Sequence, residues 1–179
     1  MTKWYVDGHP AGLSVNRAHN VVVACCEKNK LQEYTTHGSL VREICLQSPW
    51  HAVQLSSGDC VVSECTSPGV VSVVGVNGQV RHSYGESQTS DVGEMKYPRG
   101  LAVTKNDDIL VADQGNNRIL LMNSSLSSVQ EHGPWCDDWD QQQYDDGIDQ
   151  PWCLFLDESR GRLYVGELDG GRVLVFSDV

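Results

Sequence analysis

Six histidines and seven cysteines are the residues of this 179-residue chain whose types best suit metal or nucleophile chemistry. They are His9, His19, His37, His51, His82 and His132, with Cys25, Cys26, Cys45, Cys60, Cys65, Cys136 and Cys153. Metal sites need ligand-type spacing, such as C-x-x-C pairs, and no such spacing occurs. A bridge within the vicinal pair Cys25–Cys26 would be strained. We therefore expect no catalytic, cofactor-binding or metal-binding site, and reduced cysteines in an intracellular protein.

Acidic residues gather in one segment, DDWDQQQYDDGID, at residues 137–149. Six Asp in thirteen residues offer oxygen ligands at a density that suits Ca²⁺. The segment lacks the loop pattern and the closing Glu of an EF-hand, so we interpret it as a solvated insertion and leave Ca²⁺ binding open. The chain also contains no Gly-rich phosphate loop and no nucleophile motif.

A more specific arrangement is LVADQGNNRILLM, residues 110–122, in which two apolar runs flank a polar break. This pattern predicts a hairpin. Asp113 can accept hydrogen bonds from turn amides, and Arg118 can pair back to Asp113. Gly115 is expected to supply a backbone conformation closed to other residues. We interpret the three residues as a structural loop clasp rather than as catalytic groups.

The elements around this hairpin are parts of a repeat. Prolines at positions 10, 49, 98 and 151 are 39, 49 and 53 residues apart, and apolar residues recur at fixed offsets after them. Three residues on lie Leu13, Ala52, Leu101 and Leu154; five on lie Val15, Gln54, Val103 and Leu156; thirteen on lie Val23, Val62, Val111 and Tyr164. Only Gln54 breaks the apolar pattern.

Each copy contains up to four short β-type runs separated by Gly, Asn, Asp and Ser. Four antiparallel strands per copy predict an all-β fold, a β-propeller with blades at about 10–48, 49–97, 98–150 and 151–179. The fourth copy stops before its fourth strand. We therefore expect residues 3–7, KWYVD, to be a strand that closes the ring or remains from a preceding blade.

The segment YPRGLAVTKNDDILVADQGNNRILLM resembles the NHL repeat, and the chain resembles the C-terminal propellers of tripartite-motif-like proteins. The resemblance is strongest in the third copy and weakest in the first two. It implies an NHL-type propeller, typically six-bladed, of which four blades are recognisable here. The other copies differ from the third at the positions of Asp113 and Arg118. The first copy has Cys25 and Lys30, the second has Glu64 and Gly69, and the fourth has Gly166 or Glu167 with Arg172. We therefore expect the complete clasp only in the third copy.

Composition narrows the function classes. The net charge of −11 argues against general binding to nucleic acid or anionic membrane. No apolar run approaches the roughly 20 residues that span a bilayer, and the N-terminus lacks the apolar core of a signal peptide. These features, with the cysteines, favour a cytoplasmic protein without a membrane partner.

The resemblance implies a non-enzymatic module that recognises a protein partner, as the substrate-recognition part of a tripartite-motif-like ubiquitin ligase whose RING would lie in a longer parent protein. Alternatives are a metal-dependent lactonase- or lyase-type propeller and an RNA-binding NHL propeller. The candidate partner-binding face comprises Trp50, Arg99, Asn116, Asn117 and Trp152. Trp and Arg are enriched at interface hot spots. A basic protein or peptide is the expected partner, and a truncated propeller is expected to self-associate.

Overall fold

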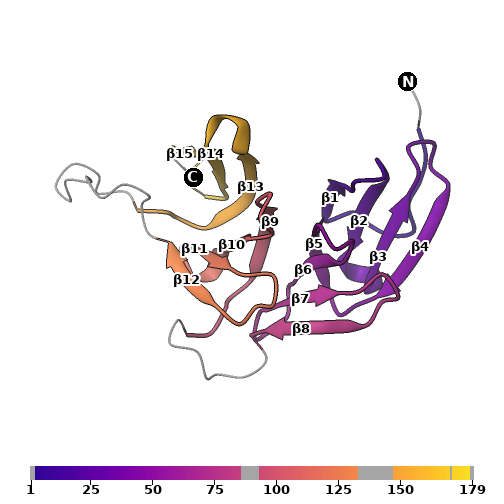
Figure 1. Cartoon of the computed structure of the whole chain (residues 1–179), viewed down its shortest axis with the longest axis horizontal. Helices are drawn as coiled ribbons and strands as arrows, with labels where there is room; N and C mark the ends of the chain where they lie inside the picture. Colours follow the sequence, from indigo (N-terminus) through magenta and orange to yellow (C-terminus); the bar gives the residue numbers. More distant parts are fainter. Residues whose placement is uncertain (1–2, 86–92, 133–146, 170, 178–179) are drawn as a thin grey trace.

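The computed structural model describes residues 3–85, 93–132, 147–169 and 171–177. They form fifteen strands in four antiparallel sheets, which we call blades 1 to 4 (Figure 1). Blade 1 contains β1 (Gly12–Val15), β2 (Val21–Cys25), β3 (Lys30–Tyr34) and β4 (Leu40–Cys45). Blade 2 contains β5 (Pro49–Gln54), β6 (Cys60–Glu64), β7 (Val70–Val74) and β8 (Val80–Tyr84).

Blade 3 contains β9 (Pro98–Val103), β10 (Ile109–Asp113), β11 (Arg118–Met122) and β12 (Val129–His132), and blade 4 contains β13 (Pro151–Asp157), β14 (Arg162–Glu167) and β15 (Val173–Ser177). Short 3₁₀ turns follow β2, β10 and β13: η1 (Cys26–Lys28), η2 (Gln114–Asn116) and η3 (Glu158–Arg160). The first strand of each blade packs beside the first strand of the next, and the four blades form an arc (Figure 1). The predicted all-β propeller with four blades is confirmed.

Three apolar layers of the core lie between neighbouring blades, and a smaller cluster lies on the outer face of blade 1. Alternation along the strands gives every blade two apolar faces, as a sheet packed on both sides requires. Between blades 1 and 2 lie Val22, Ala24, Leu31, Ile44, Ala52, Cys60, Val62 and Val74. Between blades 2 and 3 lie Leu55, Val61, Val71, Val73, Leu101, Ile109, Val111, Leu120 and Met122. Between blades 3 and 4 lie Ala102, Leu110, Ala112, Ile119, Leu163, Val165 and Phe176.

The repeat register fails by one residue in blade 4. In blade 3, Leu101 pairs with Val111, but in blade 4 the equivalent Leu154 pairs with Val165 rather than with Tyr164. The connection between the paired residues Leu156 and Leu163, which includes η3, is one residue longer than that between the equivalent pair Val103 and Ile109. Because strand side chains alternate, this shift moves Tyr164 to the opposite face and buries Val165.

Residues 3–7 do not form the expected strand. Instead, the segment lies against the outward face of blade 1, where the Trp4 ring packs on Tyr34 with centroids 5.0 Å apart. Val6 packs with Trp4 against Val23, Cys25 and Tyr34. Burial of the two side chains on blade 1 therefore places this segment at the first blade and not beside β15.

Hydrogen bonds between neighbouring blades explain the polar misfit at Gln54. Its side-chain oxygen accepts the backbone N–H of Arg17 at 2.9 Å, which joins blades 1 and 2. The equivalent loop of blade 2 donates from Ser56 N–H to Asp107 at 2.8 Å, and that of blade 3 from Lys105 N–H to Glu158 at 2.9 Å. In blades 1 to 3, the loop after the first strand is thus tied to the next blade.

Candidate functional site

Asp113 and Arg118 form an ion pair at the β10–β11 loop of blade 3. Arg118 Nε donates to Asp113 Oδ2 at 2.7 Å, and the Asp113 side chain is fully buried. The other carboxylate oxygen accepts the backbone N–H of Lys96 at 2.8 Å. Burial acts to lower the pKa of Arg118, but the bonds to Asp113 and Glu131 raise it overall. The pair therefore fastens the loop to the segment that leads into β9.

Gly115 has a different role from the one expected. Its φ lies outside the left-handed region, and Asn117 adopts that conformation instead, with φ of 54° at the end of η2. Gly115 is required by close approach, because a Cβ would lie 2.8 Å from the Cβ of Lys96. Its N–H donates to Lys96 O at 2.9 Å. The expectation of a special backbone conformation at Gly115 was wrong, since the 3₁₀ turn shifts that conformation to Asn117.

Blade 4 contains a second clasp of the same design, which corrects the expectation that only the third copy has one. Arg172 Nε donates to Glu167 Oε2 at 2.7 Å, and Glu167 Oε1 accepts the N–H of Asp149 at 2.7 Å. Burial acts to raise the pKa of Glu167, but these bonds lower it overall. The register shift of blade 4 places Glu167 opposite Pro151, where Asp113 stands opposite Pro98 in blade 3.

The loops of blades 1 and 2 are held by other contacts. In blade 1, Lys30 pairs with Glu43 at 2.9 Å and with Asp7 at 3.5 Å. In blade 2, Glu64 accepts the hydroxyl of Ser72 at 2.6 Å. Blade 1 has Cys25 at the position of Asp113, and blade 2 has Gly69 at the position of Arg118. Neither blade can therefore form the carboxylate–arginine pair.

Asn116 and Asn117 bind the chain's own backbone. Asn116 Nδ2 donates to Glu94 O and to Asp113 Oδ2, both at 2.8 Å. The side-chain oxygen of Asn117 accepts the N–H of Gln150, the residue before the next anchoring proline, at 2.9 Å. Both amides thus hold connections between blades, and neither is in the aromatic cluster described next.

Trp50, Arg99 and Trp152 come together from three blades, and we call them the Trp–Arg cluster. Each follows the proline that begins β5, β9 or β13. The two indoles meet edge to face with centroids 5.2 Å apart. The guanidinium carbon of Arg99 lies 3.9 Å from the Trp50 centroid and 4.5 Å from that of Trp152. Such contacts are cation–π interactions with both rings.

A chain of amides extends from this cluster across blades 3 and 4. Arg99 Nε donates to Gln114 at 2.9 Å, Gln114 donates to Gln150 at 3.1 Å, and Gln150 donates to Asp169 at 2.7 Å. Arg99 Nη1 is buried and has no acceptor among the described residues. Burial lowers the pKa of Arg99, and the neighbouring Cys65 and Cys26 act in the opposite direction. The cluster therefore holds a partly desolvated cation with one hydrogen-bond donor left over.

His51 is a central residue that the sequence reasoning missed. Its Nδ1 accepts the N–H of Leu101 at 3.1 Å, and its Nε2 lies 3.2 Å from Leu13 O. One side chain on β5 thus bridges β1 and β9. These partners fit a neutral ring with the proton on Nε2, and burial lowers the pKa of His51. Its position two residues after the proline, where blades 1 and 3 have glycine, was the available signal.

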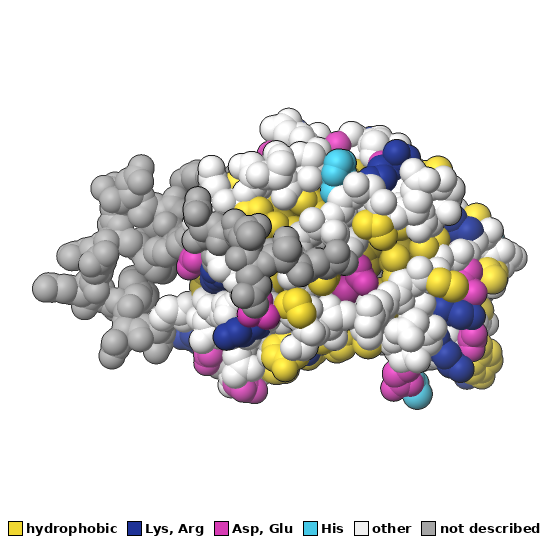
Figure 2. Space-filling view, turned by 90° about the horizontal axis from the view of Figure 1, so that it is seen from below, with side chains coloured by type: hydrophobic (Ala, Val, Ile, Leu, Met, Phe, Trp, Pro, Cys, Tyr) yellow, Lys and Arg dark blue, Asp and Glu magenta, His cyan; other side chains and the backbone are white. Residues whose placement is uncertain are grey.

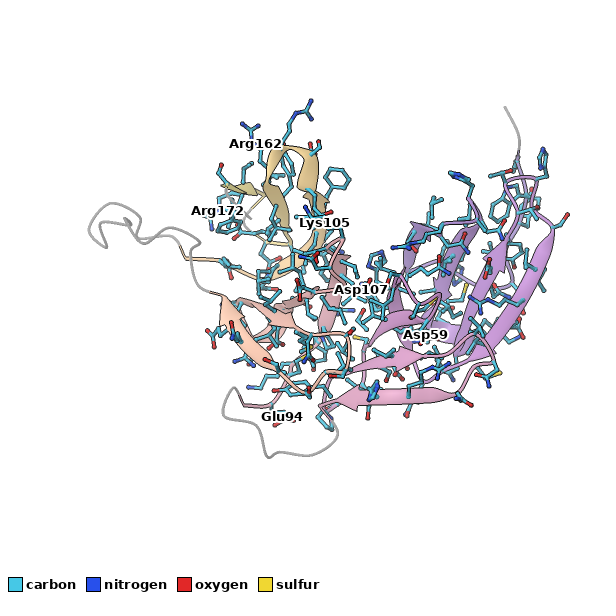
Figure 3. All side chains as sticks on the ribbon, in the orientation of Figure 1. Asp59, Glu94, Lys105, Asp107, Arg162 and Arg172 are labelled. Carbon is cyan, nitrogen blue, oxygen red and sulfur yellow. The ribbon has the colours of Figure 1, made fainter. Side chains whose placement is uncertain are left out.

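Metal-binding groups are not assembled in the described part of the chain, where no three His, Cys, Asp or Glu side chains converge. The six described cysteines are free thiols. A small hollow between blades 2 and 3 has Asp59 and Asp107 in its lining (Figure 3). Asp59 pairs with Arg81 at 3.0 Å and Asp107 binds Ser56. Of the acidic segment 137–149, residues 137–146 lie outside the described residues.

Surface charge and hydropathy offer two further observations. Figure 2 shows acidic and basic side chains interspersed over one face of the molecule, where the described residues form no large basic patch. Such a patch is the usual mark of an RNA-binding surface. Among the described residues, no helix is long and apolar enough to cross a lipid bilayer.

Family comparison places one repeat of a known type in blade 3. The NHL repeat model matches residues 95–120, which include the Asp113–Arg118 pair. Together with the blade arrangement, this match supports an NHL-type propeller. No curated protein matches the chain significantly. The similarity to tripartite-motif propellers therefore rests on the residues alone.

Solved structures share the fold at low sequence identity. A virginiamycin B lyase from Staphylococcus aureus has a TM-score of 0.62 and 14% identity over 94% of this chain and 55% of the lyase. A streptogramin B lyase has a TM-score of 0.61 and 15% identity over 96% and 55%. A protein of unknown function from Bacteroides caccae has a TM-score of 0.52 and 14% identity over 94% and 78%. The chain thus spans about half the length of the lyases, and the likeness shows the fold alone.

Proposed function

We propose that this NHL-type propeller is a recognition module that binds a protein or peptide partner through the Trp–Arg cluster. The observation that carries the proposal is the position of Arg99 between Trp50 and Trp152, with Nη1 buried and without an acceptor among the described residues. An unsatisfied buried donor costs about 1–3 kcal/mol. A partner that displaced the side chains covering Nη1 and placed a carbonyl or carboxylate oxygen beside it would recover this free energy.

Residue types and charge support the same function. Trp and Arg are enriched at interface hot spots, because Trp buries a large rigid ring and Arg presents several donors on a planar guanidinium. The net charge of −11 attracts basic partners over long range. We therefore propose that the partner carries basic residues around a segment that contacts the indoles of Trp50 and Trp152.

Two finer roles follow from resemblance. The likeness of residues 97–122 to NHL repeats of tripartite-motif-like proteins supports a role in selecting a substrate for a ubiquitin ligase. The fold shared with the streptogramin lyase supports an alternative role as a propeller enzyme of lactonase or lyase type. Metal analysis of the purified chain separates recognition from a metal-dependent enzyme, because the enzyme would retain stoichiometric metal.

Selection from a random peptide library displayed on phage tests the proposal. We expect peptides enriched in Lys and Arg that bind the wild-type chain and lose about tenfold or more in affinity with Trp50→Ala, Arg99→Ala or Trp152→Ala. Lys105→Ala, in the loop at the other end of blade 3, is the control and retains binding (Figure 3). Equal affinity of the selected peptides for all folded variants would contradict the proposed site.

A further inference from the structure

His51 occupies a position at which two other first strands approach their neighbours through a glycine. Two residues after the proline stand Gly12 in blade 1 and Gly100 in blade 3. A Cβ at Gly12 would lie 3.0 Å from the Cα of His51, and a Cβ at Gly100 would lie 2.8 Å from the Cα of Cys153. β1 therefore approaches β5, and β9 approaches β13, at a residue without a side chain. Between β5 and β9 the same position holds an imidazole ring.

This ring and a neighbouring hydroxyl hold the backbone of β9 on both sides of its glycine. His51 Nδ1 accepts the N–H of Leu101 at 3.1 Å, and Ser63 Oγ donates to Arg99 O at 2.6 Å. The Arg99 side chain starts from this fixed backbone, and its guanidinium carbon lies 3.9 Å from the ring centroid of Trp50. Because Trp50 directly precedes His51 on β5, the imidazole sets the distance between the two strands beside the Trp–Arg cluster.

The two nitrogens of the His51 ring serve different strands. Nδ1 accepts from Leu101 on β9, whereas Nε2 lies 3.2 Å from Leu13 O on β1. β9 carries Arg99, while β1 carries no member of the Trp–Arg cluster. The effect of His51 on the cluster therefore depends on Nδ1 and can be separated from its bond to blade 1.

We propose that His51 is a positioning residue for recognition, which places Arg99 against Trp50 through its Nδ1 bond to β9. The inference rests on the proposed function of the Trp–Arg cluster. Without the acceptor at Nδ1, the N–H of Leu101 loses its partner and β9 is free to shift relative to β5. A cation–π contact requires the cation within about 6 Å of the ring. A partner would then have to restore the geometry of the cluster at the expense of binding free energy.

Two substitutions at His51 separate the two bonds. The amide oxygen of Asn occupies the place of the imidazole Nδ1, and the amide nitrogen of Gln that of Nε2. His51→Asn therefore keeps an acceptor for the N–H of Leu101, and His51→Gln keeps a donor to Leu13 O. Each variant loses one hydrogen bond and the ring, so both should melt below wild type. His82→Gln, at an exposed position of β8, is the control and should behave as wild type.

Isothermal titration with the selected Lys- and Arg-rich peptides, below the melting temperature of every variant, measures recognition. His51→Gln should lose about fivefold to tenfold in affinity, which corresponds to one hydrogen bond, and His51→Asn should stay within about twofold of wild type. The Trp50 indole N–H signal in the NMR spectrum of the peptide-free chain should shift in His51→Gln and stay in place in His51→Asn. This second measurement tests the positioning without a peptide.

Each other outcome overturns the inference. Equal losses of affinity in both variants show that His51 acts only through stability, and a loss in His51→Asn alone shows that the bond to β1 positions the cluster. Unchanged affinity and an unchanged Trp50 signal in both variants show that His51 does not position Arg99. In these cases a loss with Trp50→Ala still supports the proposed function. A chain that selects no peptide contradicts the proposed function, and the Trp50 signal then decides the role of His51.

Discussion

The guanidinium of Arg99 lies against the face of Trp50 across the boundary between blades 2 and 3, at 3.9 Å from the ring centroid. The residues before the prolines of β5, β9 and β13 are Ser48, Tyr97 and Gln150, and all have positive φ. The first strands of blades 2, 3 and 4 therefore begin with the same sharp turn, which brings the residue after each proline to the cluster. The spacing of β5, β9 and β13 then determines how closely Trp50, Arg99 and Trp152 approach one another.

Gly100 sets this spacing between blades 3 and 4. A Cβ at Gly100 would lie 2.8 Å from the Cα of Cys153 and 3.0 Å from Trp152 O, both backbone atoms of β13. We expect Gly100→Ala to lower the free energy of unfolding by about 2 kcal/mol, as overpacking does. Gly147→Ala is the matched control, because its Cβ would meet nothing within 4 Å. Urea denaturation measures both, and equal stability of the two variants would contradict this close approach.

The clasp of blade 3 should contribute more stability than that of blade 4. Arg118→Ala leaves the fully buried Asp113 carboxylate without its cation, which costs about 3 kcal/mol. The Glu167 side chain is also fully buried, but the Arg172 side chain is 33% exposed against 11% for Arg118, so water screens this pair more and Arg172→Ala should cost less, about 1–2 kcal/mol. Denaturant midpoints of the two variants measure the difference.

An exposed ion pair provides the control for both clasps. Arg160 pairs with Asp157 at 2.8 Å, but its side chain is 70% exposed. Arg160→Ala should therefore unfold at the wild-type midpoint. If Arg118→Ala also unfolded at that midpoint, the interpretation of Asp113 as a buried structural anchor would be wrong.

His51 should make the protein sensitive to mild acid. Burial holds the pKa of His51 below the value of about 6.5 in the unfolded chain. Below about pH 6.5, His51 becomes protonated in the unfolded chain but stays neutral in the native protein. The free energy of unfolding therefore decreases as the pH falls from about 6.5 toward the native pKa. Above about 6.5 this contribution is constant.

His51→Gln should remove this pH dependence. The variant loses the His51 ring's bridge between β1 and β9, at a cost of about 1–2 kcal/mol near pH 7.5, and its stability should change less between pH 7 and 5.5. His82→Gln, at an exposed position of β8, is the matched control. Thermal unfolding across this pH range checks both, and identical slopes for wild type and His51→Gln would refute the buried neutral ring.

The blade pattern could be predicted from the sequence because strand alternation and turn residues are local signals. Proline anchors and apolar offsets located three blades in the correct register. The register of blade 4 could not be predicted, because one added residue before β14 inverts the alternation of that strand. The fixed offset after the proline therefore indicated Tyr164 as the buried residue, whereas the structure buries Val165. The path of residues 3–7 was equally inaccessible, since it depends on contacts of Trp4 and Val6 with blade 1.

The candidate site was predictable in composition but not in geometry. The position after each proline identified Trp50, Arg99 and Trp152, which the structure brings into contact. Asn116 and Asn117 shared the same loop end, yet their amides bind backbone of the inter-blade connections. The role of His51 depends on the distance between β1 and β9, which only tertiary packing sets.

Indole resonances test the central claim of recognition at the Trp–Arg cluster most directly. Two-dimensional NMR of the ¹⁵N-labelled chain resolves the indole N–H groups, which Trp→Phe variants assign. Saturation with a selected basic peptide should shift or broaden the signals of Trp50 and Trp152 and leave that of Trp4 unchanged, because Trp4 packs against Tyr34 on the outward face of blade 1. A peptide that binds and changes neither Trp50 nor Trp152 would contradict the proposed recognition site.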